Sequence, residues 1–256
     1  MIHKFGDRGD ESVRRHRRGT RAGYPVESTH IFDAETEKAV MVLQRVSNLV
    51  VDGVCGPKTF IALMGVSQPK HLADADLVNA AEKLGVSVAA VRAVNEVESR
   101  GQGFMSDGRP VILFERHVFW QQLQKHGVDP AALPPAKVSA NVLSESPGGY
   151  QGGPAEYVRL ETAKQLNILA AYVSASWGAF QIMGYHWKTL GYQSVLDFIA
   201  RMQTNEAEHL DAFVRFIKND PALLAALKGR KGAQFAKTYN GPAYARNLYD
   251  AKLAAA

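Results

Sequence analysis

The sequence predicts a mostly α-helical protein with a small β element, an α+β arrangement, preceded by a small three-helix domain. Three observations support this prediction. Apolar residues recur at helical spacing through most of the chain from residue 156 onward. One apolar run, 111–114, is followed by charges and indicates a short buried strand that leads into a helix. Near the start, residues 31–40 and 54–63 align with one another as two related turn-to-helix units.

Length and composition limit the possible classes of protein. The chain has 256 residues, enough for two domains with a sizeable core, and a formal net charge of +5 that suits an acidic partner such as nucleic acid, anionic membrane or wall polymer. No run approaches the roughly 18 apolar residues of a membrane span. The single cysteine, Cys55, excludes an internal disulfide and a multi-cysteine metal site. The basic cluster at 14–21 lacks interleaved aromatic residues, so a solvated helix face is favoured over a nucleic-acid arm.

The N-terminal domain is predicted over residues 1–66. Residues 39–49 indicate an amphipathic helix between the two related units, and Pro57 suits the first position of the helix that follows it. A linker is predicted over 67–74, where Pro69 interrupts the helical pattern, and a larger domain over 75–256.

The larger domain is predicted to begin with two helices that break at Gly85, and a turn at 105–110 then leads to the strand at 111–114. Residues 130–155 are rich in proline and glycine and are predicted to form a loop. Further helices are predicted over 156–177, 194–219, 221–229, 232–240 and 243–256.

The residue types present favour carboxylate chemistry. The eight histidines do not form a zinc-binding pattern, and neither a nucleophile elbow nor a phosphate-binding loop is present in the sequence. Cleavage of a glycosidic bond requires a protonated carboxylic acid in a partly apolar setting. Glu98, in "NEVESRGQGF" (95–104), ends an apolar helix and is followed by glycines. Glu96 points about 200° away around the same helix, so it is a weaker candidate.

Residues 43–59, "LQRVSNLVVDGVCGPKT", resemble the peptidoglycan-binding type-1 domain. The first helix departs from the family's pattern, with arginines in it. The resemblance implies a noncatalytic module that binds wall peptides or glycan through Asp52, Gly53, Gly56 and Thr59. The alternative is a helical module with no ligand of its own.

Three segments in order, "ESRGQGF", "SWGAFQIMG" and "YNGPAY", resemble the lysozyme-like superfamily, and most of residues 72–256 is similar to the N-acetylmuramidase domain of modular bacteriophage endolysins. The resemblance implies a lysozyme-like fold and a hydrolase that cleaves between N-acetylmuramic acid and N-acetylglucosamine, with Glu98 as general acid. It implies peptidoglycan as partner and no metal or cofactor; we expect a monomer that binds no nucleic acid. The alternatives are a lytic transglycosylase that uses the same Glu98 and a noncatalytic wall-binding or virion structural protein.

A second carboxylate is expected at Glu115, which the strand would carry to the opposite wall of the cleft. Glu115 could instead cap the following helix or pair with Arg116, and Asp107 in the turn is the other candidate. Substrate contacts are predicted at Ser99, Phe104, His117, Gln181, Tyr239 and Asn240.

Structural roles remain open for several of these residues: Gln181 and Asn240 could brace buried backbone, Tyr239 could fill core, and His117 could be a packed helix histidine. Trp120 and Trp177 are predicted to be core. The charged start of the chain lacks the apolar segment of a signal peptide. We therefore expect the protein to stay in a host cytoplasm until a holin releases it to peptidoglycan in the periplasm, as in the family.

Overall fold

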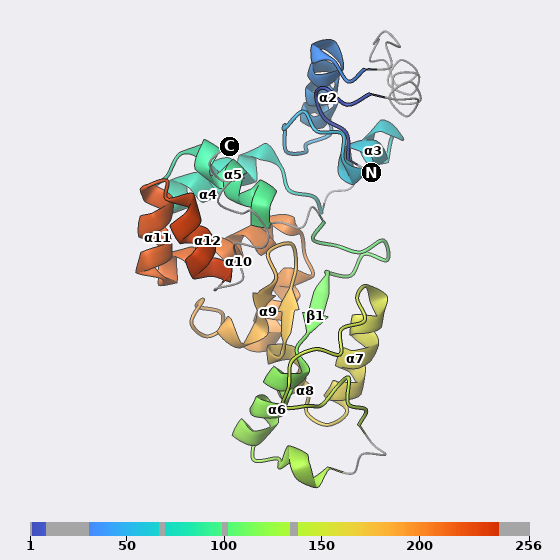
Figure 1. Ribbon diagram of the computed structural model, residues 1–256, viewed down its shortest axis with the longest axis vertical. Helices are drawn as coiled ribbons and strands as arrows, with labels where there is room; N and C mark the ends of the chain where they lie inside the picture. Colours follow the sequence, from blue (N-terminus) through green and yellow to red (C-terminus); the bar gives the residue numbers. More distant parts are fainter. Residues whose placement is uncertain (1, 9–30, 67–69, 99–101, 134–137, 241–256) are drawn as a thin grey trace. The chain divides into compact units, whose positions relative to one another are not determined.

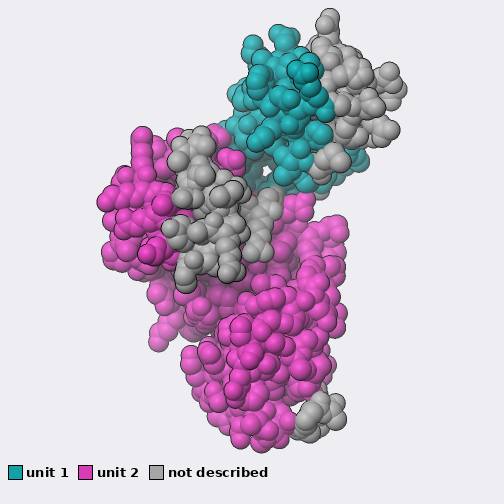
Figure 2. Space-filling model, in the orientation of Figure 1, with its two compact units in different colours: residues 1–78 teal, residues 79–256 magenta. Residues whose placement is uncertain are grey.

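The computed structural model describes residues 2–8, 31–66, 70–98, 102–133 and 138–240. The chain divides into two compact units, residues 1–78 and 79–256, coloured separately in Figure 2. The division falls within helix α4 (Asp74–Leu84). Among the described residues no helix is both long and apolar enough to cross a membrane.

The smaller unit contains helices α2 (Ala34–Val46) and α3 (Pro57–Leu63), which pack against each other. The side chain of Asp33 caps α2 by accepting a hydrogen bond from the backbone N–H of Thr36, and Pro57 begins α3. The helical patterns at 31–40 and 39–49 therefore belong to one continuous helix. The arginine-rich first helix of the predicted three lies outside the described residues.

The larger unit is mostly helical with a small sheet, as the sequence predicts (Figure 1). After α4 its helices are α5 (Val88–Glu98), α6 (Arg116–Lys125), α7 (Pro154–Lys164), α8 (Ile168–Val173), α9 (Val195–Met202), α10 (Glu206–Asn219), α11 (Pro221–Lys228) and α12 (Gly232–Asn240). Two single turns of 3₁₀ helix, η1 (Pro130–Ala132) and η2 (Gly184–His186), complete the described helical elements.

The sheet has three antiparallel strands in the order β1 (Ile112–Phe114), β2 (Ala175–Trp177), β3 (Ile182–Met183). Ile112 lies opposite Trp177, and Trp177 lies opposite Ile182. The strand expected at 111–114 is confirmed as β1, and the strand leads directly into α6. The sheet joins segments that are far apart in the sequence, so its formation depends on tertiary packing.

The helix predicted over 156–177 is wrong in its second half. α7 ends at Lys164, α8 restarts where the Asn167 side chain accepts a hydrogen bond from the backbone N–H of Ala170, and residues 175–177 form a strand. A short apolar run has the same pattern in a buried helix and in a buried strand, which is why periodicity failed here. The helix predicted over 194–219 is likewise two helices, because Asn205 caps α10.

The core of the larger unit contains residues of the sheet and of the helices on either side of it in the sequence. Trp177 is buried, which confirms its predicted core position, whereas Trp120 is partly exposed. The apolar face of α10 contributes Leu210, Phe213 and Ile217 to this core. The helix predicted at 243–256 lies outside the described residues.

Candidate active site

Glu98 is the last residue of α5, as the sequence predicts. α5 buries Val91 and Val94 in the core, so one face of this helix is anchored. The side chain of Glu98 and all of Ser99 lie outside the described residues. The chain is described again from residue 102, and its contacts there show how the segment after Glu98 is held.

Gly103 and Phe104 pack against two buried polar side chains of α10. The backbone N–H of Gly103 donates a 2.8 Å hydrogen bond to Oε1 of Glu206, and the ring of Phe104 stacks on the imidazole of His209 with centroids 4.9 Å apart. A Cβ added to Gly103 would lie 2.5 Å from Nδ1 of His209. A side chain at this position would therefore displace the histidine, and this glycine serves close packing inside the protein.

His209 also holds the start of the β2–β3 hairpin. Its Nδ1 accepts a 3.1 Å hydrogen bond from the backbone N–H of Ala179, and its Nε2 lies 2.7 Å from the carbonyl oxygen of Met202. These two contacts place the ring proton on Nε2. Gly178 has φ +74°, and an added Cβ would lie 2.6 Å from Cγ of His209. The His209 ring thus contacts both the segment that contains Gly103 and the β2–β3 hairpin.

Gln181 braces this hairpin from within. Its Nε2 donates to the carbonyl oxygens of Gly178 at 2.8 Å and Val111 at 3.3 Å, and its Oε1 accepts from the hydroxyl of Ser176 at 2.8 Å. Gln181 also has φ +51°, in the left-handed region. The alternative in which it bonds to backbone is therefore observed, and its contact with substrate stays a prediction.

Tyr239 lies in an aromatic cluster of the larger unit. Its hydroxyl donates a 2.9 Å hydrogen bond to the carbonyl oxygen of Phe180, and its ring contacts Phe213, Phe216 and Phe235. These contacts show the core-filling alternative, and a role in sugar stacking stays a prediction. Asn240 ends α12, and its side chain lies outside the described residues.

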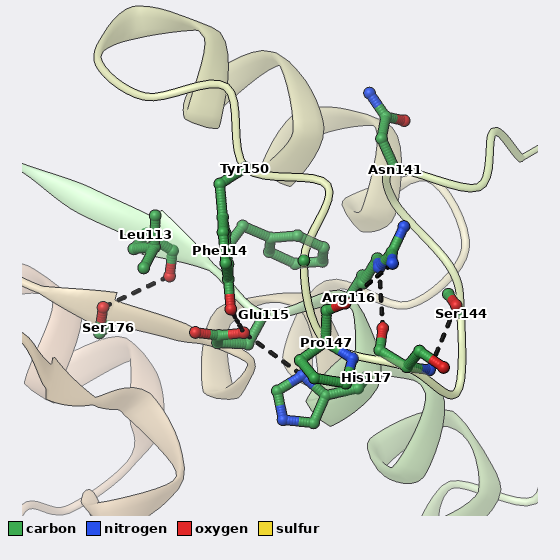
Figure 3. A network of polar contacts seen from close by, with 12 residues as sticks. Leu113, Phe114, Glu115, Arg116, His117, Asn141, Ser144, Pro147, Tyr150 and Ser176 are labelled. Atoms are coloured by element: carbon green, nitrogen blue, oxygen red, sulfur yellow. Dashed lines mark hydrogen bonds and ion pairs between the residues drawn. The ribbon is translucent and has the colours of Figure 1, made fainter. Parts of the chain in front are cut away.

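Glu115 lies between β1 and α6, and its carboxylate has two polar neighbours (Figure 3). The hydroxyl of Tyr150 donates a 2.8 Å hydrogen bond to Oε2, and Nδ1 of His117 lies 3.3 Å from the same oxygen. Burial and the hydrogen bond to Glu115 raise the pKa of Tyr150, so this phenol remains a donor at neutral pH. Glu115 occupies the capping position of α6, but its side chain makes no capping hydrogen bond, so the carboxylate points toward Tyr150 and His117.

Arg116 fastens the loop that carries Tyr150. Its guanidinium donates to the carbonyl oxygens of Ala140, Ser146 and Pro147 at 2.8–2.9 Å. Arg116 does not pair with Glu115 in the described structure. The ion pair considered above as an alternative role for Glu115 is therefore not observed. Gly149 has φ +75°, and an added Cβ would lie 2.9 Å from Cα of Asn141, so this turn requires glycine.

A buried ion pair on α7 holds the residue before Glu115. Glu156 and Arg159 are each at most 1% exposed, and Nη1 of Arg159 lies 2.6 Å from Oε2 of Glu156. The carboxylate accepts a hydrogen bond from the N–H of Phe114, and the guanidinium donates to the carbonyl oxygen of Phe114. Both polar groups of this strand residue are therefore fixed by the pair, which sets the direction in which the chain delivers Glu115.

The pKa of Glu156 is lowered despite its burial. Desolvation opposes ionisation, but the carboxylate accepts hydrogen bonds from the backbone amides of Gln151, Phe114 and Gly152 and from Arg159. Those bonds outweigh the desolvation and keep the group ionised. Of these three amides, those of Gln151 and Gly152 belong to the end of the loop that carries Tyr150.

Asp107, the other candidate for the second carboxylate, lies in an exposed turn. Oδ2 accepts hydrogen bonds from Nε and Nη2 of Arg109 at 2.9 and 2.7 Å, and Oδ1 accepts one from the backbone N–H of Arg109. Hydrogen bonding to Arg109 lowers the pKa of Asp107. Its carboxylate is thus engaged by a neighbouring side chain.

In the smaller unit the residues predicted to bind the wall form an internal network around Gln44. Its Nε2 donates to Oδ1 of Asp52 at 2.6 Å and to Oγ1 of Thr59 at 3.1 Å, and its Oε1 accepts from the backbone amides of Asp52 and Gly53. Gly56 precedes α3 as its capping residue. The network explains this pattern of residues as a fold requirement, and their contact with the wall stays a prediction.

Sequence reasoning missed Tyr150, Glu156, Arg159, Glu206 and His209. A signal for the last two was present: Glu206 and His209 are three residues apart, and His209 precedes the apolar Leu210 and Phe213 on the face of α10 that packs in the core. Polar side chains on an apolar helix face must find buried partners. No comparable signal marks Tyr150, which lies in the loop. Within the described residues no group of three or more histidine, cysteine, aspartate or glutamate side chains is arranged to hold a metal ion.

Comparisons with known proteins match both units. Residues 87–256 match the family model described as "N-acetylmuramidase", and residues 20–63 match the model described as "Putative peptidoglycan binding domain". A search of the curated proteins found no match. The chain is similar to the crystal structure of an endolysin from Burkholderia phage AP3, with 48% sequence identity over 99% of this chain and 95% of that chain and a TM-score of 0.91. Both resemblances predicted from the sequence motifs are confirmed.

Proposed function

Because the chain belongs to the N-acetylmuramidase family, a family of glycoside hydrolases that act on peptidoglycan, we propose that Glu98 and Glu115 are its two catalytic carboxylates. Glu98 ends α5, and Glu115 follows β1. Glu98 is the general acid that protonates the glycosidic oxygen between N-acetylmuramic acid and N-acetylglucosamine. Glu115 is the second carboxylate, whose negative charge stabilises the oxocarbenium-like transition state.

The setting of Glu115 is the observation that supports this assignment. The carboxylate is at the end of a strand whose preceding residue is fixed by a buried ion pair, and Tyr150 donates a hydrogen bond to it. A preorganised carboxylate costs little reorganisation when charge develops on the substrate. Asp107, by contrast, is exposed and bound by Arg109.

Residue substitution separates these roles. On purified peptidoglycan we expect Glu98→Gln to reduce kcat about 10³-fold and Glu115→Gln about 10²-fold, since acid–base and electrostatic groups contribute on this scale. Asp107→Asn serves as the control and should stay within about two-fold of wild type, because its carboxylate is exposed and, in the part of the chain that the structure describes, bonds to Arg109. A loss in Asp107→Asn as large as that in Glu115→Gln would move the second carboxylate to the turn.

The products and the binding of the same variants separate the alternative functions. Mass spectrometry should find reducing N-acetylmuramic acid ends; anhydromuramic ends would instead identify a lytic transglycosylase. Glu98→Gln should still sediment with insoluble peptidoglycan while it no longer cleaves it. Unchanged cleavage in this variant would rule out Glu98 as the acid.

The biological role that fits this pair of units is that of a phage endolysin. The similar crystal structure is that of a phage endolysin, and the match covers nearly the whole of both chains. The N-terminal module holds the enzyme on the wall and raises its effective concentration along the polymer. The protein acts as a monomer and waits in the host cytoplasm until a holin gives it access to periplasmic peptidoglycan. Light scattering and fractionation of host cells before and after lysis test these two points.

A further inference from the structure

An open groove of about 930 Å³ lies beside α6 in the larger unit. His117 and Tyr185 line it, and the imidazole of His117 lies next to the Glu115 carboxylate. Nδ1 of His117 lies 3.3 Å from that carboxylate, and the pKa of Tyr185 is raised by burial and by the negative charge of Glu115. One end of the groove, at His117, therefore lies next to the proposed second carboxylate.

One wall of the groove is a polar row on α6. His117, Gln121 and Lys125 line the groove and are four residues apart, so they lie above one another on one helix face, and Gln122 lies next to them. No ion pair of the described residues involves Lys125, and no aspartate or glutamate is among the described residues that line the groove. This wall offers positive charge and amide groups to a ligand.

The opposite wall is apolar. Leu169, Tyr185 and Leu196, contributed by α8, η2 and α9, line the groove and are 45%, 43% and 52% exposed. Trp187 lines the same wall and is half-buried. Several large apolar side chains exposed together in one groove indicate a binding surface.

We propose that this groove binds the peptide stem of the wall polymer, an acidic peptide joined to the N-acetylmuramic acid beside the bond that is cleaved. The inference rests on the proposed function. Carboxylates of the stem face Lys125, its peptide groups bond with Gln121 and Gln122, and its methyl and methylene groups lie on the apolar wall. In the intact polymer the lactyl carboxyl of each N-acetylmuramic acid is joined to the stem as an amide, so the glycan strand has no free carboxylate to pair with this lysine.

The dimensions suit such a ligand. From His117 to Lys125 the helix rises about 12 Å, at about 1.5 Å per residue. An extended peptide covers the same distance in about four residues. The row on α6 therefore has the length of a short peptide that starts next to the proposed second carboxylate.

Two substrates test the proposal: peptidoglycan that carries its stems, and glycan strands from which an amidase has removed the stems and whose freed lactyl carboxylates are then capped as methylamides. We expect Lys125→Glu to lower kcat/KM about five-fold on the first substrate, as expected for reversal of an exposed charge, and to leave the second unchanged. The matched control is Lys218→Glu, which makes the same change at an exposed lysine in the last turn of α10, outside the groove. It should leave both substrates unchanged.

The remaining outcomes contradict either this proposal or the proposed function. An equal loss on both substrates would assign the groove to the glycan strand, and no loss on either would remove the groove from substrate binding. Leu196→Gln tests the apolar wall in the same way, and its half-exposed side chain makes misfolding no concern. Cleavage of neither substrate by wild type would count against the proposed function alone.

A binding measurement is independent of catalysis. Free stem tetrapeptide, titrated into the Glu98→Gln chain, should shift the amide NMR signals of Gln121 and Lys125, and Lys125→Glu in that background should weaken the binding about five-fold. Shifts elsewhere, with none on α6, would overturn the proposal.

Discussion

The two proposed catalytic carboxylates enter the site on segments that are held in different ways. The chain around Gly103 is held largely by shape, because Gly103 and Gly178 both pack against the neutral ring of His209, and the N–H of Gly103 also donates to Glu206. The segment that ends in Glu115 is held by charge, because Glu156 and Arg159 bind both polar groups of Phe114. Both supports consist of buried polar side chains. Each holds a segment that has little regular secondary structure. The first should be sensitive to added volume, and the second to loss of one partner.

Loss of one charge should have the largest effect. We expect Arg159→Met to lower the free energy of unfolding by about 3–5 kcal/mol, because it leaves a buried carboxylate at Glu156 unpaired. The matched control is Lys164→Met, which breaks an exposed pair with Glu161 at the same spacing on the same helix and should cost less than about 1 kcal/mol.

Tryptophan fluorescence during chemical denaturation measures this difference in the larger unit alone. All three tryptophans of the chain lie there: Trp120, Trp177 and Trp187. Equal losses in the two variants would show that the buried pair contributes no more than a surface pair.

Added volume at the shape-based support should have the next largest effect. Gly178→Ala should lower the free energy of unfolding by about 3 kcal/mol, since the new methyl group combines a positive φ with a clash against His209. Gly127→Ala is the control, because Gly127 has nearly the same φ, +75°, with open space around it. The difference between the variants in denaturation isolates packing from backbone strain. A similar cost in both would mean that His209 moves aside freely.

A smaller effect is expected at Tyr150. Removal of its hydroxyl in Tyr150→Phe should lower kcat about ten-fold, because the Glu115 carboxylate loses its hydrogen-bond donor. Tyr157→Phe removes a hydroxyl that, among the described residues, donates to the carbonyl oxygen of Pro110 and not to Glu115, so it should change kcat less than two-fold. Steady-state kinetics on purified peptidoglycan makes the comparison. Equal effects in both variants would remove Tyr150 from the proposed site.

Acid should weaken the charge-based support. The pKa of Glu156 is lowered in the folded protein below its ordinary value of 4.5, so its stabilising contribution is present above that value and is lost as the pH falls through the folded pKa. The difference in stability between wild type and Glu156→Gln should therefore shrink as the pH is lowered from 6 to 3. Denaturation at each pH measures it, and a constant difference would show that ionisation of Glu156 does not contribute.

The support at each carboxylate was less predictable than the carboxylate itself. Glu98 and Glu115 follow from local context, a helix end and a strand end, which are readable as short-range patterns. Tyr150 and Arg159 were not found, because the contacts that define them join residues far apart in the chain. The strand β2 was missed for the same reason: its apolar run becomes a strand only by pairing with β1.

The sequence by itself determined the helical character of the chain, the division into a small module and a larger domain with the family of each, and the position of Glu98 at a helix end. These features depend on side-chain periodicity, capping residues and local motifs, which act over a few residues. Only the tertiary structure decided that Gly103 and Gly178 meet at His209, that Glu115 faces Tyr150, and that Asp52 and Thr59 bond to Gln44. The physical reason is that a buried polar group must find its partner wherever the fold places one, and one-dimensional spacing does not encode that place.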